Sequence, residues 1–253
     1  MDFDDKTDSV QEFWAAYHQS SKDIAKGHPP IPQDSREWPK EWTTVYYKAY
    51  PRLPKIDLDD ESLSFNLFSA IQQRKSRRDF SSNPISKREL SLLLKYSCGI
   101  TGSMDQEQMH RRAQPSGGAR FPVETYILLF RGEDIEAGLY HYNVKDHKLD
   151  VLLSDKFSPE VIQKYFVYPW IADAACALVL TAVFDRTNVK YGERGYRYAM
   201  LEAGHIGQNV YLVSEALGIK CCAMGGTIDN SLEELFDIDG ITESVIYGLI
   251  VGR

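Results

Sequence analysis

The sequence contains few cysteines and no segment typical of a membrane span or a secretion signal. Four cysteines occur among 253 residues, and neither they nor the six histidines show the spacing of a common zinc site. We therefore expect reduced, buried thiols and no metal. No apolar run approaches the roughly 20 residues that cross a bilayer, and the acidic start MDFDDKTDSV lacks a basic region before an apolar one. These absences predict a cytoplasmic protein with no membrane partner.

The chain also lacks an excess of positive charge. Its 29 lysines and arginines are outnumbered by 36 aspartates and glutamates, so the formal net charge is -7. Because general nucleic-acid binding is driven by basic surfaces, no nucleic-acid partner is expected. No predicted strand is followed by the motif GxGxxG, which argues against a Rossmann unit that binds a dinucleotide. Hydrophobic residues make up 43% of the chain, enough for an ordinary globular core.

Residues 1–60 differ in composition from the rest of the chain. The spacing within residues 9–27 predicts an amphipathic helix that ends at Gly27. Six prolines then follow within residues 29–54 and prevent regular helix. The same region is rich in large aromatic residues: Trp14, Trp38, Trp42, Tyr46, Tyr47 and Tyr50. Because aromatic side chains favour contact with another surface, we predict an ordered arm rather than a flexible linker, joined to a second domain of residues 61–253.

Residues 61–253 alternate between helical and strand patterns. Helices are predicted at 64–76, 86–99, 196–217 and 230–236, and strands at 123–130, 138–152 (a hairpin that turns near 145–147), 175–184, 219–224 and 244–252. Ser86 and Glu89 form a capping box, and Asn230 is the expected cap of the last helix. Strand 175–184 is apolar without alternation, as expected of a central strand. The pattern predicts an α+β fold in which helices flank one mixed sheet.

The long helix predicted at 196–217 contains Gly204 and Gly207. A glycine inside a helix costs about 1 kcal/mol relative to alanine. Close approach of another backbone is the usual reason for such a residue. The approaching segment could belong to this chain or to a second subunit, and the residues alone leave both alternatives open.

Three short segments carry candidate binding chemistry. The first, RKSRRDF at 74–80, places cations and a hydroxyl together, which suits either a solvated helix end or a phosphate clamp. The second, RRAQPSGGARFP at 111–122, exposes backbone N–H groups at its glycines. The third, AMGGTID at 223–229, follows a strand and precedes a helix, where α/β sheets often bind ligands. Each glycine turn could equally be a plain surface turn.

A fourth segment, NVKYGERGYR at 188–197, raises a different question. The turn after a buried strand needs glycine, but it does not need five cations and tyrosines in so few positions. The segment is either a solvated loop or a set of proton-handling groups held beside a site. The residues alone do not separate these interpretations.

The order of these segments strongly resembles the nitroreductase superfamily. The resemblance rests on RKSRRDF, RRAQPSGGARFPVE, GLYHYN, KYGERGYRYAMLEAGHIGQNVYLVSEALGIKCCAMGG and the closing IVGR. Within that superfamily, the sequence is similar to the SagB-type dehydrogenases, which include azoline oxidases that form thiazoles and oxazoles in ribosomally made peptides. The resemblance covers residues from about 63 to 253 and implies a nitroreductase-like fold in a domain-entwined homodimer.

The resemblance implies FMN as cofactor, bound at the homodimer interface. The residues that would hold the ribityl phosphate are Arg74, Lys75, Ser76 and Arg78, with Arg253 returning to it from the C-terminal end. The turn that would lie along the isoalloxazine ring is Pro115, Ser116, Gly117 and Gly118. Gly225 and Gly226 would present a backbone N–H near flavin N5. The glycines of the long helix are then interpreted as a dimer-interface feature.

The resemblance also implies catalytic roles for Lys190 and Tyr191, in a loop before the long helix. Oxidising a thiazoline removes a hydride, which the flavin accepts, and a proton, for which the protein must supply a base. Lys190 would be that base, with its pKa lowered by burial and by Arg194 and Arg197. Tyr191 would donate to the ring heteroatom or relay the proton. An uninvolved loop lysine is the alternative.

These inferences favour an FMN-dependent azoline oxidase of a ribosomally made peptide, with O2 reoxidising the flavin and a cyclodehydratase as partner. One alternative is an NAD(P)H-dependent reductase of nitroaromatics or quinones, a reaction that needs no base such as Lys190. The other is a non-catalytic subunit of a biosynthetic complex. The intact basic segment and both glycine turns argue against this last function.

Overall fold

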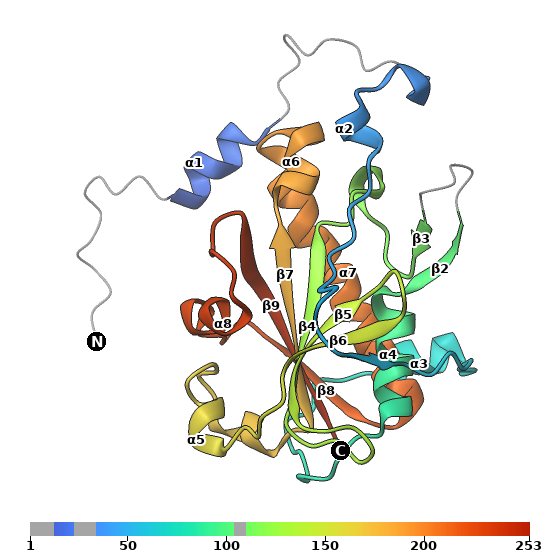
Figure 1. The fold of residues 1–253 in the computed structure, drawn as a ribbon, viewed down its shortest axis with the longest axis vertical. Coiled ribbons are helices and arrows are strands. Elements are labelled where there is room, and N and C mark those ends of the chain that lie inside the picture. The colour runs from blue at the N-terminus through green and yellow to red at the C-terminus, as the bar shows by residue number, and fades with distance from the viewer. Residues whose placement is uncertain (1–12, 23–33, 104–109) are drawn as a thin grey trace, which may run out of the picture.

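The computed structural model describes residues 13–22, 34–103 and 110–253 (Figure 1). The helix predicted at 9–27 is represented by α1 (Phe13–Ser20). The remainder of that prediction, including Gly27 and the first three prolines of the arm, lies outside the described residues.

A seven-stranded sheet forms the centre of the domain, in the order β1-β6-β5-β4-β7-β9-β8. Its strands are β1 (Lys55–Asp57), β4 (Val123–Leu129), β5 (Gly138–Asn143), β6 (Lys148–Leu153), β7 (Cys176–Val183), β8 (Lys220–Met224) and β9 (Glu243–Gly252). A separate hairpin joins β2 (Ile100–Ser103) to β3 (His110–Arg112). The predicted strands are all present, and β7 is buried along nearly its whole length, as its apolar sequence indicates.

Each neighbouring pair of strands in this sheet is antiparallel. The helical crossover from β7 to β8 makes those two strands run in the same direction, but β9 lies between them and opposes both. Within the described residues, the parallel pairing of the expected mixed sheet is limited to an isolated bridge between Ile85 and Gly132. The antiparallel pairing follows from how the strands are connected, and the composition of the strands does not determine it.

The helices are α2 (Lys40–Thr43), α3 (Leu67–Gln73), α4 (Lys87–Cys98), α5 (Pro159–Ile162), α6 (Asp185–Tyr191), α7 (Arg194–Leu217) and α8 (Asp229–Phe236), with short 3-10 turns at Ser35–Glu37, Gly117–Ala119 and Pro169–Asp173. The capping box of Ser86 and Glu89 at the start of α4 is confirmed. The predicted cap of α8 is wrong. Thr227 donates to Asp229, the helix begins at Asp229, and Asn230 therefore falls inside the first turn.

Two apolar cores lie on the two faces of the sheet, because alternate residues of each strand point to opposite sides. On one face, Ile127 of β4 and Leu178 of β7 pack with α4 and α7. On the other face, Leu128 and Val179 pack with α5 and α8. Figure 1 shows α8 and α5 on one side of the sheet and α4 with α7 on the other. This α+β arrangement agrees with the fold expected from the sequence.

The described part of the arm lies against the body of the domain. Its chain follows the sheet in Figure 1 and ends in β1, which pairs with β6 at the sheet edge. Lys48 bonds Glu243 at 2.5 Å, and Lys55 forms an ion pair with Asp150. These contacts are those of an ordered arm rather than of a flexible linker.

The long helix α7 ends at Gly218, which adopts the left-handed conformation with φ of 68°. Gly207 has an internal explanation, because a Cβ there would lie 2.7 Å from the ring of Tyr247. Its interpretation as a dimer-interface feature is therefore wrong: the close approach is made by β9 of the same chain. Gly204 has nothing within 4 Å of its Cβ position and remains exposed.

Candidate active site

Lys190 and Tyr191 lie in the last turn of α6, not in a loop. The sequence prediction placed a loop here because of the glycines that follow. Gly192 ends the helix with φ of 55°, and α7 begins only two residues later. Lys190 and Tyr191 are therefore the last two residues of a helix that connects β7 to α7. Their backbone is held in the helical conformation.

The turn at Ser116–Gly118 lies directly against this pair. A Cβ added at Gly118 would clash with the Tyr191 hydroxyl and would stand 3.2 Å from Lys190 Nζ. At Gly117 a Cβ would lie 3.3 Å from the ring of Tyr198, which packs edge to face on Tyr191 at 4.9 Å between ring centroids. Two segments some 70 residues apart in sequence, both predicted to be functional, thus meet in one place.

Aromatic side chains of the arm cover Lys190. Its Nζ lies 3.8 Å from the ring centroid of Trp38 and 5.8 Å from that of Trp42. Burial lowers the pKa of Lys190 from its ordinary value, and the positive charge of Arg120 lowers it further. Burial, together with Tyr198, raises the pKa of Tyr191 and keeps its hydroxyl protonated. The pair thus combines a weakened ammonium with a tyrosine that can donate.

The cation that depresses the pKa of Lys190 is not one that the sequence indicated. Arg194 donates to the Tyr198 hydroxyl at 3.1 Å, and Arg197 donates to Ser21 Oγ at 2.8 Å and to the carbonyl of His18. Arg194 thus bonds within α7 and Arg197 holds α1, while the pKa of Lys190 is lowered by burial and Arg120, so the predicted tuning role of the two arginines is wrong. Arg120 acts instead, and only its position after the glycine turn could have indicated it.

Replacing Gly118 with alanine is expected to disturb Lys190 specifically. Gly118 and Gly218 share nearly the same backbone conformation, with φ of 62° and 68°, so each alanine costs about 1–2 kcal/mol of backbone strain. Only at Gly118 would the new methyl group displace Lys190 and Tyr191, since Gly218 has free space around it. Gly118→Ala should lose more stability in urea unfolding than Gly218→Ala, because its methyl group also clashes, and only Gly118→Ala should change the acylation rate of Lys190. Equal Lys190 reactivity in the two would contradict this geometry.

The basic segment surrounds Tyr211 of α7. Ser76 Oγ and the Tyr211 hydroxyl share a hydrogen bond of 2.7 Å, and the Arg74 guanidinium lies 5.1 Å from the Tyr211 ring centroid. The same hydroxyl accepts from the backbone N–H of Ala223 at 2.7 Å. Arg77, which was not assigned to the phosphate, pairs with Glu215. The segment is therefore anchored to the end of β8 that leads into the Gly225–Gly226 turn.

A pocket opens beside that turn, lined by Arg78, Tyr168, Trp170, Cys222, Ala223, Met224 and Gly225. None of the described residues lies within 4 Å of the Cβ position of Gly225, so its backbone is open to a ligand. At Gly226 a Cβ would lie 2.6 Å from the Tyr168 ring, so glycine is required there. Arg78 and Lys75 are exposed, which leaves their charges available for an anion.

Arg253 is engaged within the chain. Its guanidinium pairs with Glu89 at 2.5 Å and donates to the Pro84 carbonyl at 3.1 Å. Its carbonyl accepts from Ser81, just after the basic segment, so the residue lies near that segment. Its contact with a phosphate stays a prediction.

These residues form two groups at opposite ends of the molecule. The turn end contains Lys190, Tyr191 and the Gly117–Gly118 turn, and the basic end contains the 74–78 segment and the Gly225–Gly226 turn. Along α7 they contact Tyr198 and Tyr211 respectively, 13 residues or about 20 Å apart. In Figure 1, α6 lies near the top of the long axis and the C-terminus at the bottom. One chain does not bring the two groups together.

Glu202 of α7 is a buried acid near the turn end, and no sequence pattern singled it out. It accepts from Gln114 Nε2 at 3.1 Å, while its Oε2 and Gln114 Oε1 have no hydrogen-bond partner in the part of the chain that the structure describes. Burial raises the pKa of Glu202 to about 7, against the opposing effects of Ser116 and Gln114. A protonated Glu202 would satisfy both orphan oxygens, since its O–H can donate to the amide oxygen.

The free energy of unfolding should therefore depend on pH through Glu202. The folded-state pKa is above the unfolded value, so folding favours the protonated acid, and its stabilising contribution is lost as pH rises towards and beyond about 7. Glu202→Gln, which is neutral at every pH, should lose less stability than the wild type between pH 5 and pH 8. Urea unfolding of both proteins checks this, and identical pH profiles would contradict it.

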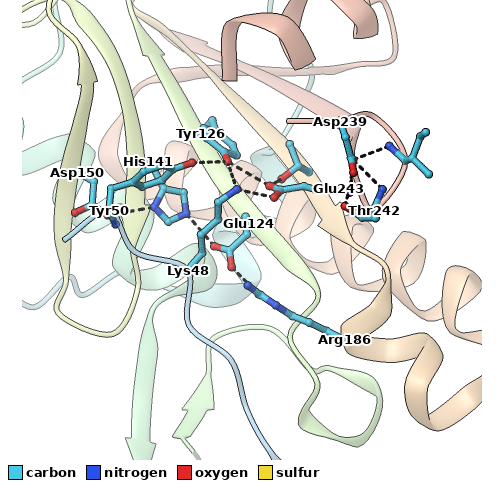
Figure 2. A network of polar contacts seen from close by, with 12 residues as sticks. Lys48, Tyr50, Glu124, Tyr126, His141, Asp150, Arg186, Asp239, Thr242 and Glu243 are labelled. Carbon is cyan, nitrogen blue, oxygen red and sulfur yellow. Dashed lines mark hydrogen bonds and ion pairs between the residues drawn. The ribbon is translucent and has the colours of Figure 1, made fainter. Parts of the chain in front are cut away.

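A second buried network lies on the arm side of the sheet (Figure 2). His141 contacts Glu124 at 3.0 Å and Asp150 at 3.4 Å, and Arg186 of α6 pairs with Glu124 at 2.5 Å. Burial acts to raise the pKa of Glu124, but Arg186 and His141 outweigh it and hold that pKa well below its ordinary value. The network fixes α6 to the sheet at a residue one turn before Lys190.

The described residues contain neither a cluster of metal ligands nor a helix that could span a membrane. No group of three or more histidines, cysteines, aspartates or glutamates in 13–22, 34–103 and 110–253 is arranged to hold a metal ion. Within the same ranges, no helix has the length and apolar character needed to cross a membrane.

Comparison with known proteins identifies related sequences. A model of the nitroreductase family matches residues 71–253. A predicted nitroreductase of Methanocaldococcus jannaschii, MJ1384, is 31% identical over 188 residues, which cover 74% of this chain and 88% of that protein. The trifolitoxin-processing protein TfxB of Rhizobium leguminosarum is 29% identical over 222 residues, 82% of this chain and 59% of TfxB. The microcin B17-processing protein McbC of Escherichia coli is 30% identical, over 51% of this chain and 49% of McbC. The chain thus spans about half the length of these two processing proteins.

Solved structures share the fold. A nitroreductase-like protein of Anabaena variabilis superposes with a TM-score of 0.74 at 22% identity, over 100% of this chain and 49% of that one. The E. coli microcin synthetase McbBCD, solved with truncated pro-MccB17 bound, gives a TM-score of 0.61 at 22% identity, over 95% of this chain and 91% of the matched chain. A nitroreductase-like protein of Desulfovibrio desulfuricans in complex with FMN gives 0.50 at 18% identity, over 75% and 86%.

Proposed function

Since the chain belongs to the nitroreductase family, we propose that it is an FMN-dependent oxidase that converts azoline rings of a ribosomally made peptide into azoles. The observation that carries the proposal is the Lys190–Tyr191 pair packed against the Gly117–Gly118 turn. The similarity to TfxB and McbC, both peptide-processing proteins, supports the SagB-type branch and a peptide substrate. The matched part is 59% of TfxB and 49% of McbC, so the proposal concerns only the function of that part.

The residues of the basic end fit the requirements of FMN. Lys75 and Arg78 are exposed cations beside the Ser76 hydroxyl, which suits a phosphate group. The open backbone of Gly225 and the pocket beside it suit a flat ring that takes a hydrogen bond from a backbone N–H. Arg74, Lys75, Ser76 and Arg78 would therefore hold the phosphate, and Gly225 and Gly226 would contact the ring near N5. An FMN-bound structure of the same fold supports this cofactor.

A homodimer would unite the two ends of the site. The turn at Pro115, Ser116, Gly117 and Gly118 lies about 20 Å along α7 from the basic end of its own chain, so a second copy in the opposite direction can supply it. An exposed apolar face near the basic end supports this arrangement: Phe65, Leu67, Phe68 and Ile71 are 46%, 57%, 78% and 51% exposed. Such a surface is typical of an interface.

Each protein group then has a defined part in the reaction. FMN, when bound, supplies the acceptor for the hydride that leaves the azoline ring. Lys190 as a neutral amine accepts the proton that leaves the neighbouring ring carbon, which completes the loss of two hydrogens and forms the ring double bond. Tyr191 keeps its proton and donates a hydrogen bond to the ring heteroatom. O2 takes up the electrons in a separate step.

Two inactive variants should complement each other if the site is shared between subunits. Lys190→Met removes the base at the turn end, and Arg78→Glu reverses a charge at the basic end. A mixed dimer then contains one intact site, made of Lys190 from one subunit and Arg78 from the other. Random mixing should restore about a quarter of wild-type sites, measured as peptide that has lost two hydrogens per ring by mass spectrometry. No recovery in verified mixed dimers would place both ends of a site within one subunit.

The reductase of nitroaromatics or quinones is the second candidate. The 31% identity to MJ1384, named as a nitroreductase, favours it. This reaction does not require Lys190, because a nicotinamide delivers its hydride without the help of a protein base. Steady-state turnover of NADPH with a nitroaromatic acceptor, faster than turnover of a thiazoline peptide, would favour this candidate.

A partner enzyme is part of the proposal. An azoline arises by cyclising a serine or cysteine of the peptide with loss of water, so a cyclodehydratase must act first. The fold shared with a chain of the microcin synthetase complex supports a stable association of the two enzymes. Co-purification with the partner, tested by size-exclusion chromatography, checks it.

A further inference from the structure

We infer that Arg120 is a positioning residue for Lys190: its guanidinium fastens the arm onto α6 and adds a positive charge beside the Lys190 amine. This inference deepens the proposed function, because it assumes that Lys190 is the base. Arg120 itself touches neither the proposed substrate nor the cofactor. It acts through the place and the charge state of Lys190.

The first observation is the set of partners that Arg120 bonds. Its guanidinium is fully buried and donates to the carbonyls of Glu41, Trp42 and Thr44 at 3.0, 2.8 and 2.6 Å. Its Nε donates to the carbonyl of Arg186 in α6 at 2.9 Å. One side chain therefore links α2 of the arm to the helix that carries Lys190, which explains why Trp38 and Trp42 cover that residue.

The second observation is the charge of this guanidinium. Among the described residues, Arg120 forms no ion pair, and the acceptors it bonds are uncharged carbonyls. An arginine remains protonated in a protein interior, so its charge is not neutralised locally. The groups that face Lys190 are Arg120, Tyr191 of its own helix and the indoles of Trp38 and Trp42. No carboxylate among the described residues contributes to the shift of its pKa, so the field favours the neutral amine.

The third observation is the backbone that presents Arg120. Gly118, Ala119 and Phe121 all have positive φ, of 62°, 53° and 48°. For alanine and phenylalanine this conformation is sterically unfavourable, and such strain persists only where surrounding contacts hold it. The strained turn directs Arg120 inward below the same glycine that contacts Lys190. Arg186 reinforces it by donating to the Phe121 carbonyl at 3.0 Å.

The test measures the acylation of Lys190 with acetic anhydride across pH by mass spectrometry, without substrate. The exposed Lys156 in the same protein is the internal reference. In the wild type, Lys190 should become reactive at lower pH than Lys156. Arg120→Met should shift the Lys190 profile to higher pH, while Arg120→Lys, which keeps the charge, should remain closer to wild type. Arg131→Met, which removes a half-buried arginine that also bonds a carbonyl, should change nothing at Lys190.

The outcomes separate the inference from the function it rests on. If wild-type Lys190 becomes reactive at the same pH as Lys156, or if a folded Arg120→Met variant leaves its profile unchanged, the inference fails. The wild-type comparison decides even if Arg120→Met does not fold. If the labelling results are as expected but Lys190 has no effect on turnover, the role of Arg120 stands and the azoline oxidase function fails. If both hold, the acidic limb of the turnover profile, where turnover rises as Lys190 loses its proton, should move with the labelling profile.

Discussion

Replacing Lys190 with methionine is expected to lower the turnover of a thiazoline peptide by about 10²- to 10⁴-fold, the usual contribution of a positioned base. Methionine keeps the length and the packing of the side chain against Trp38 but cannot accept a proton. FMN content should not change, because none of the contacts assigned to FMN is made by the Lys190 side chain. Turnover per bound flavin is the quantity to compare.

The matched control is Lys156→Met, which removes an exposed lysine far from α6 and should keep full turnover. Lys190→Arg provides a second comparison, because it keeps the positive charge but offers no base near neutral pH. Full activity in Lys190→Met with bound FMN would exclude Lys190 as the base. Loss of flavin together with activity would instead indicate a role in the binding site.

Replacing Arg186 with methionine is expected to lower the free energy of unfolding by about 3–5 kcal/mol, the typical result of breaking a buried ion pair. Glu124 is 3% exposed in this pair and Arg186 is 8% exposed, so the variant leaves the buried Glu124 carboxylate without its arginine partner. His141 remains beside Glu124 and offsets part of the loss. The midpoint of urea unfolding measures the change.

Two comparisons make this prediction specific. Arg88→Met removes an ion pair with Glu61 in which both side chains are about half exposed, and should cost no more than about 1 kcal/mol. Adding Glu124→Gln to Arg186→Met should restore part of the lost stability, because the unpaired buried charge disappears. If Arg186→Met and Arg88→Met unfold at the same urea concentration, the network in Figure 2 does not stabilise the fold in this way.

Local patterns in the sequence were sufficient to predict most of the secondary structure. The capping box at Ser86, the hairpin turn near 145–147 and the buried strand β7 depend on neighbouring residues, and all are present. The start of α6 was missed because the helix begins at Asp185, only two residues after β7 ends, with no glycine or proline between them to mark the boundary. The direction of β9 between β7 and β8 was also missed, since strand order depends on contacts far apart in the chain.

The candidate site was predicted in part. The sequence identified the Gly117–Gly118 turn and Lys190 separately as candidate site residues, and the structure brings them into contact. The separation of the turn end from the basic end could not be read from the order of motifs, because it depends on which part of α7 each segment packs against. Arg120 was passed over since a buried arginine is indistinguishable from an exposed one in sequence. The proposed role of Arg120 depends on its bonds to backbone carbonyls, and because every residue has a carbonyl, the sequence does not mark these partners.

The reduction of bound flavin under argon tests the central claim most directly. The protein, loaded with oxidised FMN, is mixed with a thiazoline peptide and in parallel with NADPH, and the visible absorbance of the flavin is followed. We expect that the peptide bleaches the flavin and gains a thiazole, that NADPH does not bleach it, and that Lys190→Met stays coloured with the peptide. Bleaching by NADPH together with no change on adding the peptide would contradict it.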